Sequence, residues 1–195
     1  MLESFEKIPV KIYKDVATGS NAVAAQIAKL IKEKQAQGAP CVLGMATGAT
    51  PILLYKELVR LHKEEGLSFK NVMTVNLDEY YPIPREAYQS YWSFMHRHLF
   101  NHVDIDPKNI HLPNSEWSKD ELKEKCVAYE QTIEKLGGID LQILGIGKNG
   151  HIGFNEPGSS FHSKTRVIHL DQLTRMANVY EWHDLNKVPK LAISV

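Results

Sequence analysis

Short apolar runs alternate with amphipathic segments along this chain, and this alternation constrains the fold more than any other feature. In the segments between the runs, apolar residues recur at helical spacing, as in the stripe of Leu54, Leu58 and Leu61. Alternating strands and helices are typical of βαβ units, so we expect an α/β, Rossmann-like, doubly wound fold. Its sheet should be mostly parallel, with helices on both faces. The predicted strands cover residues 10–13, 41–45, 72–77, 139–144, 165–170 and 191–195.

The predicted helices have recognisable first residues. Thr18 or Ser20 is predicted to cap the first helix, and Pro51 to occupy the first position of the second. A third is expected over residues 90–100. Ser118, with Glu121 three residues later, predicts a capping box at the start of the next. A short helix is expected between the last two strands.

Length, charge and cysteine content narrow the class of protein. The 195 residues suit one domain, residues 1–195, but the apolar run 191–195 resembles a buried strand, so we expect a missing C-terminal part. The 23 basic and 23 acidic residues cancel, which disfavours nucleic acid and anionic membranes as partners. No run approaches the roughly 18 apolar residues of a membrane span, and the charged N-terminus lacks a secretory core. The two cysteines form no disulfide framework. We therefore predict a cytoplasmic protein.

Three segments directly follow predicted strands: residues 46–51, 78–81 and 145–156. Ligands of open α/β sheets bind beyond the carboxyl ends of the strands, so these segments should converge. The turn at 46–51 joins a strand to a helix N-terminus, where free N–H groups and the helix dipole suit a phosphate. It lacks a P-loop lysine. A simple turn with a threonine cap explains the same residues equally well.

Acid–base residues occur in the other two segments. Asp78 and Glu79 are adjacent, so on a strand they point to opposite faces, and one can face a cleft as a proton acceptor. Ordinary solvated turn residues are the alternative. In the glycine-rich segment 145–156, His151 lies near Asn149 and Glu156, and a histidine oriented by a carboxylate is a common acid–base device. A structural histidine is the alternative.

Two other motifs are set aside. Gly145, Gly147 and Gly150 match the glycines of a dinucleotide-binding turn, but Pro157 and further glycines follow where a helix should begin. His98 and His102 have the spacing of zinc ligands on a helix, but no carboxylate or cysteine completes a set. We predict no metal site.

Three sequences together resemble the glucosamine-6-phosphate deaminases of the glucosamine/galactosamine-6-phosphate isomerase family. They are LGMATGATP, NLDEYY with SYWSFMHRHLFNHVDI, and LGIGKNGHIGFNEPGSSFHSKTRVI. The resemblance covers nearly the whole chain. It implies an enzyme that converts glucosamine 6-phosphate and water to fructose 6-phosphate and ammonia. It also implies no cofactor, an amino-sugar phosphate as the small-molecule partner, and a homo-oligomer.

The resemblance further implies roles for individual residues. His151 would open the sugar ring, Asn149 and Glu156 would orient it, and Asp78 would move a proton from C2 to C1. The phosphate would be held by Gly48, Ala49 and Thr50. Ser159 and Arg166 match an allosteric site of some members.

Several positions depart from the family pattern. Ala49 replaces a usual glycine, Val179 and Tyr180 stand where many members have a phosphate-binding arginine, and Ile168 replaces an allosteric lysine. A second phosphate-binding cation, a lysine, lies in the family beyond Val195. These departures keep two alternatives open: a sugar-phosphate-binding sensor with weakened catalysis, or a phosphosugar hydrolase of the 6-phosphogluconolactonase type.

Overall fold

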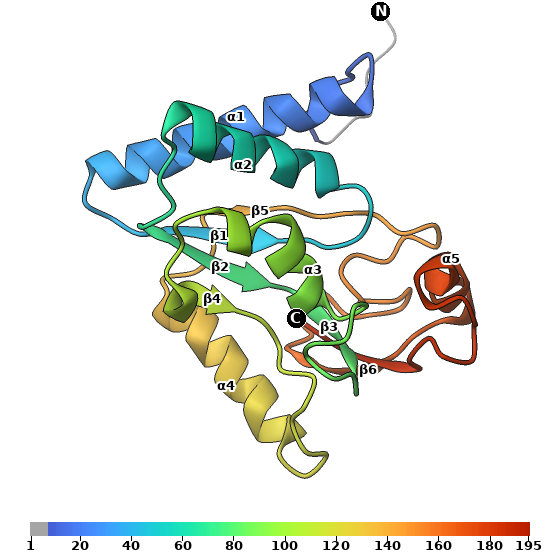
Figure 1. The fold of residues 1–195 in the computed structure, drawn as a ribbon. Coiled ribbons are helices and arrows are strands. Elements are labelled where there is room, and N and C mark those ends of the chain that lie inside the picture. The colour runs from blue at the N-terminus through green and yellow to red at the C-terminus, as the bar shows by residue number, and fades with distance from the viewer. Residues whose placement is uncertain (1–7) are drawn as a thin grey trace, which may run out of the picture.

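A parallel four-stranded sheet forms the centre of the molecule. The computed structural model describes residues 8–195, and its parallel strands lie in the order β4-β2-β1-β5 (Figure 1). β1 pairs with β2 along its full length, with Cys41 opposite Val72 and Met45 opposite Asn76. The sequence therefore predicted the parallel sheet correctly. The bounds are β1 Cys41–Met45, β2 Val72–Asn76, β4 Ile110–His111 and β5 Leu141–Gln142.

Helices cover both faces of this sheet, as expected for a doubly wound fold. Cys41, Leu43 and Met45 of β1 point to the larger core, which they share with α1 and α2. The alternate residue Val42 points to the opposite face, where it packs with Tyr129 of α4. Figure 1 shows α1 and α2 on one side of the sheet and α4 on the other. The bounds are α1 Val16–Ala36, α2 Ile52–Glu65, α3 Tyr91–His98, α4 Leu122–Lys135 and α5 Gln172–Trp182.

A second, antiparallel sheet adjoins the first, and the sequence did not predict it. Its strands are β3 (Asp78–Tyr81), β7 (Leu191–Ser194) and β6 (Arg166–His169), in the order β3-β7-β6. Only Leu77 separates β2 from β3, so the apolar pattern runs on without a turn signal. Residues 78–81 were predicted as a segment that follows the strand 72–77, but they form a strand of their own and all four pair with β7.

Other local predictions need correction. Residues 10–13 form no strand, and Val10 and Ile12 are exposed there instead of being buried in a sheet. Asp15, not Thr18 or Ser20, caps α1: its carboxylate accepts the N–H of Thr18 at 2.7 Å.

The start of α4 is also later than predicted. The hydroxyl of Ser118 donates to the Glu121 carboxylate at 2.5 Å, and the Glu121 N–H donates to the Ser118 carbonyl at 3.1 Å. This side-chain contact differs from the side-chain-to-backbone bonds of the predicted capping box. The two residues form a turn that precedes the helix, which begins at Leu122.

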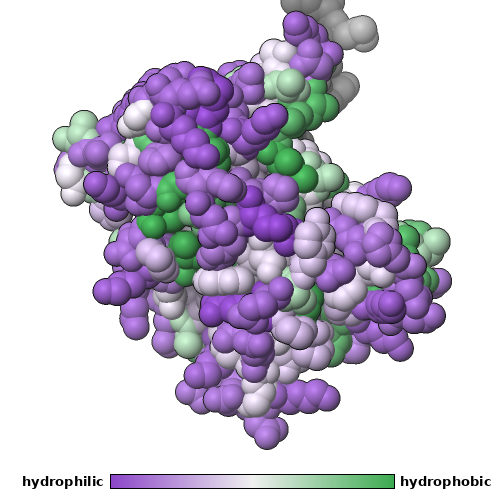
Figure 2. Space-filling model, viewed as in Figure 1, coloured by the Kyte–Doolittle hydropathy of each residue, from purple (hydrophilic) through white to green (hydrophobic). Residues whose placement is uncertain are grey.

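The face in Figure 2 is mainly hydrophilic, with its hydrophobic residues in separate groups. Over residues 8–195, no helix combines the length and apolar character needed to cross a bilayer.

Candidate functional site

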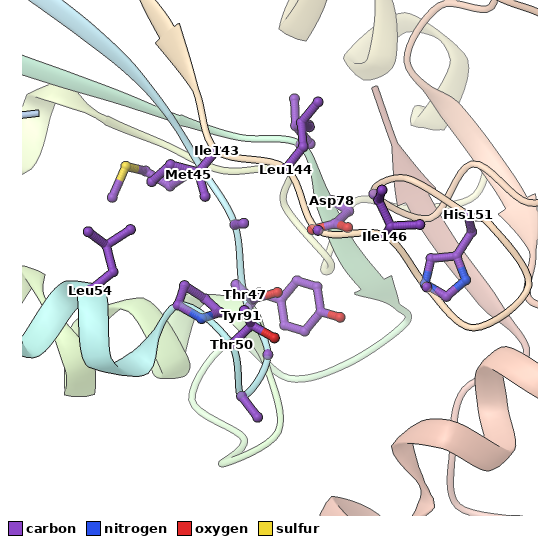
Figure 3. A pocket seen from close by; sticks show the side chains of 18 of the residues that line it. Met45, Thr47, Thr50, Leu54, Asp78, Tyr91, Ile143, Leu144, Ile146 and His151 are labelled. Atoms are coloured by element: carbon purple, nitrogen blue, oxygen red, sulfur yellow. The ribbon is translucent and has the colours of Figure 1, made fainter. Parts of the chain in front are cut away.

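One pocket of about 460 Å³ lies at the carboxyl ends of β1, β2 and β5. The three segments that follow predicted strands all contribute to its lining, so the expected convergence occurs. Figure 3 shows Thr47 and Thr50 on one side of this pocket and Asp78 and His151 on the other. A helix N-terminus, a carboxyl group and an imidazole therefore face one space.

The β1–α2 turn presents backbone N–H groups to this pocket. Gly48 adopts a φ of +93°, a conformation that favours glycine, whereas the neighbouring Ala49 lies outside the left-handed region and tolerates its methyl group. Within residues 8–195, the N–H groups of Gly48, Ala49 and Thr50 donate to no protein acceptor. Together with the α2 dipole, they form a site suited to an anion.

Two neighbouring residues support this turn. Pro51 is the N-cap of α2 and not its first helical residue as predicted. Tyr55, one turn into α2 and buried, donates its hydroxyl to the carbonyl of Ala46 and accepts the Ala46 N–H at 3.2 Å. These bonds fix the turn against the end of β1.

Fixed cations are absent from the described lining of the pocket. Of the lining residues between 8 and 195, none is a lysine or arginine. Asn178 of α5 contributes to the lining, but Val179 and Tyr180 follow it where an arginine was expected from the resemblance. Anion binding in this part of the chain therefore depends on backbone N–H groups and hydroxyls.

Asp78, the first residue of β3, supplies a buried carboxyl group to the pocket. Its exposed fraction is 8%. Burial, with a smaller contribution from the nearby Glu79 charge, raises the pKa of Asp78 to about 7. A carboxyl group with a pKa near neutrality can both accept and return a proton.

Glu79 points away from the pocket, as the strand geometry predicts. Its carboxylate accepts the backbone N–H groups of Tyr80, Tyr91 and Trp92 at 2.9, 3.0 and 3.1 Å. Two of these donors belong to the first turn of α3. Burial raises the pKa of Glu79 to about 7, although these bonds and the Arg85 charge act in the opposite direction. Glu79 therefore joins β3 to α3.

The loop after β5 brings Asn149, His151 and Glu156 together. The Asn149 Oδ1 lies 2.6 Å from His151 Nδ1, and the Asn149 Nδ2 donates to Glu156 Oε2 at 2.8 Å. Glu156 Oε2 itself is 3.9 Å from the imidazole. The carboxylate thus acts on the histidine mainly through the asparagine amide.

This arrangement fixes the protonation of the neutral imidazole. The carboxylate of Glu156 can only accept, so the Asn149 amide must turn its NH₂ toward Glu156 and its oxygen toward His151. That oxygen accepts from the His151 backbone N–H at 3.2 Å and from Nδ1. Nδ1 therefore carries the hydrogen, and Nε2 keeps a free lone pair. Because His151 lines the pocket, this lone pair is available for proton transfer.

Two residues of this site were not predicted. The hydroxyl of Thr174 in α5 lies 3.1 Å from His151 Nδ1. Gly147 lies directly against the His151 ring, so that a Cβ atom at residue 147 would overlap the ring atoms Cε1, Nδ1 and Nε2. The glycine-rich pattern indicated that the backbone of this loop approaches another group closely. It did not indicate which glycine lies against the histidine ring. No local signal identifies Thr174, which is 23 residues from His151.

Gly147 offers a direct test of this packing. In Gly147→Ala the added Cβ would lie 2.1 Å from the nearest ring atom, so the His151 ring must move by more than about 1 Å to restore van der Waals separation. A displacement of this size would slow any reaction that uses His151 by roughly 100-fold. We expect altered ring ¹⁵N chemical shifts for His151. In Gly145→Ala the added methyl group meets nothing within 4 Å, so these shifts should stay unchanged. Unchanged shifts in Gly147→Ala would contradict the packing.

Ser159 and Arg166 also lie close together. The guanidinium of Arg166 donates to the Ser159 hydroxyl at 3.2 Å. The pair is exposed and does not line the pocket. A role for the two residues in regulation remains a prediction.

The fold and the pocket define an α/β protein with an acid–base site at the carboxyl ends of its parallel strands. The chain belongs to the glucosamine-6-phosphate isomerase/6-phosphogluconolactonase family, whose model matches residues 14–173. A glucosamine-6-phosphate deaminase of Lysinibacillus sphaericus is 49% identical over 172 residues, which are 88% of this chain and 72% of the relative. One of Oceanobacillus iheyensis is 51% identical over 154 residues, 79% of this chain and 61% of the relative.

Other relatives differ in length and in the strength of the match. A glucosamine-6-phosphate deaminase-like protein of Bacteroides thetaiotaomicron is 49% identical over 175 residues. These residues are 90% of this chain but only 26% of the longer Bacteroides protein. The solved structure of a monomeric glucosamine-6-phosphate deaminase aligns with a TM-score of 0.91 and 42% identity, covering 96% of this chain and 76% of that one. A 6-phosphogluconolactonase from Thermotoga maritima, at 18% identity and a TM-score of 0.72, shares the fold. These likenesses confirm the predicted fold class.

Proposed function

We propose that this chain converts glucosamine 6-phosphate and water to fructose 6-phosphate and ammonia. The observation that carries the proposal is the placement of the Asp78 carboxyl group and the His151 imidazole on one pocket. The names of the similar proteins support the choice of substrate. The chain spans 61 to 72% of the length of these two deaminases. The activity is therefore a proposal for the whole protein, and it is argued from the site residues that this chain contains.

The first step opens the sugar ring. His151 Nε2 takes the proton of the anomeric hydroxyl, and the imidazolium returns a proton to the ring oxygen, which releases the open-chain aldehyde. Asn149 and Glu156 keep Nε2 in its basic form for this exchange. The sugar phosphate is anchored at the β1–α2 turn by Gly48, Ala49 and Thr50.

The second stage moves a proton between carbons. The Asp78 carboxylate removes the proton from C2, O1 takes a proton from the ammonium group that the substrate carries at C2, and a neutral enolamine forms. Asp78 then returns its proton to C1, which gives a ketimine that water hydrolyses to the ketone and ammonia. The pKa of Asp78, about 7, suits a group that accepts a proton and gives it back near neutral pH. The scheme uses no metal or cofactor.

A substrate panel tests this proposal. The purified, folded protein should release ammonia and fructose 6-phosphate in equal amounts from glucosamine 6-phosphate. It should hydrolyse 6-phosphogluconolactone at no more than about 1% of that rate, a difference of roughly 3 kcal/mol in transition-state stabilisation. Lactone hydrolysis without ammonia release would overturn the proposal.

The lack of a lysine or arginine in the described lining favours a second candidate, a sugar-phosphate sensor. Each hydrogen bond to a charged group that is missing from the phosphate site costs about 1.5–3 kcal/mol, which weakens substrate binding by roughly one to two decades. A protein with such a site would bind a sugar phosphate and turn it over poorly. Titration calorimetry separates the two. Saturable binding of glucosamine 6-phosphate without ammonia release would favour the sensor.

Location and assembly extend the proposal. A cytoplasmic location is part of the proposal, and it is supported by the charge of a phosphorylated sugar, which keeps such a substrate in the compartment where it is made. The homo-oligomer predicted from the resemblance contrasts with the monomeric deaminase of similar structure. Light scattering after size-exclusion chromatography distinguishes these states.

A further inference from the structure

Thr174, in the first turn of α5, is buried beside the imidazole that faces the pocket. Its exposed fraction is 2%. Its hydroxyl lies 3.1 Å from His151 Nδ1 and 3.4 Å from Asn149 Nδ2. The residue does not itself line the pocket, so it cannot act on a ligand there directly. Any effect on chemistry must pass through Asn149 and His151.

The threonine hydroxyl accepts a hydrogen of the Asn149 amide that has no other acceptor among the described residues. One hydrogen of the Asn149 NH₂ is used by Glu156 at 2.8 Å, and Thr174 Oγ1 accepts the other. The same oxygen lies within reach of the Nδ1 hydrogen, which Asn149 Oδ1 accepts at 2.6 Å. The hydroxyl therefore completes the polar surroundings of both side chains.

An ordinary structural role explains this hydroxyl less well. A threonine in a helix often bonds its own backbone three or four residues earlier. Within residues 8–195, the side chain of Thr174 makes hydrogen bonds only to Asn149 and His151. The start of α5 also binds the third member of the group, because the N–H of Asp171 donates to Glu156 Oε1 at 2.9 Å. Asp171, the N-cap of α5, and Thr174 in its first turn thus contact Asn149, His151 and Glu156.

We infer that Thr174 is a positioning residue, which holds the Asn149 amide and the His151 ring in the orientation that presents Nε2 to the pocket. The inference rests on the proposed function for its kinetic consequence, but the orientation of the ring can be measured without turnover. Removing the hydroxyl leaves an Asn149 N–H without an acceptor in a buried environment. The amide and the ring then lose one of the contacts that exclude other orientations.

The experiment compares Thr174→Val, which replaces the hydroxyl with a methyl group of similar size, with Thr174→Ser, which keeps the hydroxyl. In Thr174→Val, we expect the His151 ring ¹⁵N shifts to move from those of the Nδ1–H tautomer toward averaged values. The turnover number for ammonia release should fall about fivefold to tenfold. KM should change less than twofold. Thr174→Ser should restore both the shifts and the rate to within about twofold of the original protein.

Thr132→Val is the matched control. Thr132 also lies in a helix, α4, and its hydroxyl bonds the Ala128 carbonyl at 2.9 Å, far from the pocket. This variant should leave the His151 shifts and the rate unchanged. The inference is overturned if Thr174→Val keeps the original ring shifts, or if Thr174→Ser is as impaired as Thr174→Val. A protein that releases no ammonia would refute the proposed function, while the ring shifts would still decide the role of Thr174.

Discussion

Asp78→Asn should abolish turnover and at the same time make the folded protein more stable at and above pH 7. An amide cannot accept the C2 proton, so we expect the rate of ammonia release to fall by roughly 100- to 10,000-fold. The same change removes a buried carboxyl group whose pKa is raised to about 7. Loss of activity with a gain in stability would separate a catalytic role from a structural one.

The direction of the stability effect follows from proton binding. The pKa of Asp78 is about 7 in the folded state and 3.8 in its ordinary state. Between these values the folded state binds more protons than the unfolded state, so the free energy of unfolding decreases as the pH rises from about 4 to about 7. Asp78→Asn removes this decrease and should gain about 2 to 4 kcal/mol above pH 7. The pKa of Glu79 is also raised, so in Asp78→Asn this residue still lowers the free energy of unfolding as the pH rises.

Asp104→Asn is a control for which we expect the opposite change in stability. Burial would raise the pKa of Asp104, but the Phe69 N–H at 2.6 Å and the Ser68 hydroxyl at 2.9 Å outweigh burial, and the pKa is lowered. This variant should therefore lose stability at neutral pH and keep its activity. Urea unfolding of both variants at pH 4, 6 and 8 measures the difference. A fall in stability for Asp78→Asn at pH 8 would contradict the account of Asp78.

The second large effect is expected for His151→Gln. Glutamine keeps a polar side chain but cannot cycle a proton near neutral pH, so ring opening should slow by roughly 100- to 10,000-fold. If ring opening then limits the rate, deuterium at C2 of glucosamine 6-phosphate should no longer slow the reaction. The isotope effect on turnover should fall toward 1 in the variant, compared with a larger value in the original protein.

The isotope effect also identifies which step His151 serves. A rate loss with an undiminished isotope effect would show that His151 acts in the carbon-to-carbon proton transfer and not in ring opening. His169→Gln is the control, because His169 is exposed on β6 and lies away from the pocket. This variant should retain both the rate and the isotope effect of the original protein.

The sequence predicted the parts of the structure that depend on local pattern. The apolar run 41–45 and the helical stripe of α2 have a single simple interpretation, so β1 was predicted with its observed bounds and the start of α2 was missed by one residue, Pro51. The rule that ligands bind at the carboxyl ends of parallel strands brought Asp78 and His151 to one pocket. The strand geometry also separated Asp78 from Glu79, and the structure confirms that they face opposite ways.

Features that depend on tertiary contact were missed. The run 10–13 has the alternation of a strand but finds no partner within the described residues, and pairing, not propensity, makes a strand. The antiparallel sheet escaped prediction because β3 follows β2 after a single residue, Leu77. The contact between Thr174 and His151 depends on how α5 packs, which no local sequence signal encodes.

The central place of β7 in the antiparallel sheet has a consequence for folding order. β7 pairs with both β3 and β6, with Asp78 opposite Ser194 across more than half of the chain. Ser194 Oγ also accepts the Phe154 N–H at 3.2 Å in the loop that carries His151. Such contacts have a high contact order and form slowly because long loops must close first. The β1–α2 turn belongs to a segment of local contacts, so we expect it to form early, whereas Asp78 and His151 come together only when β7 docks.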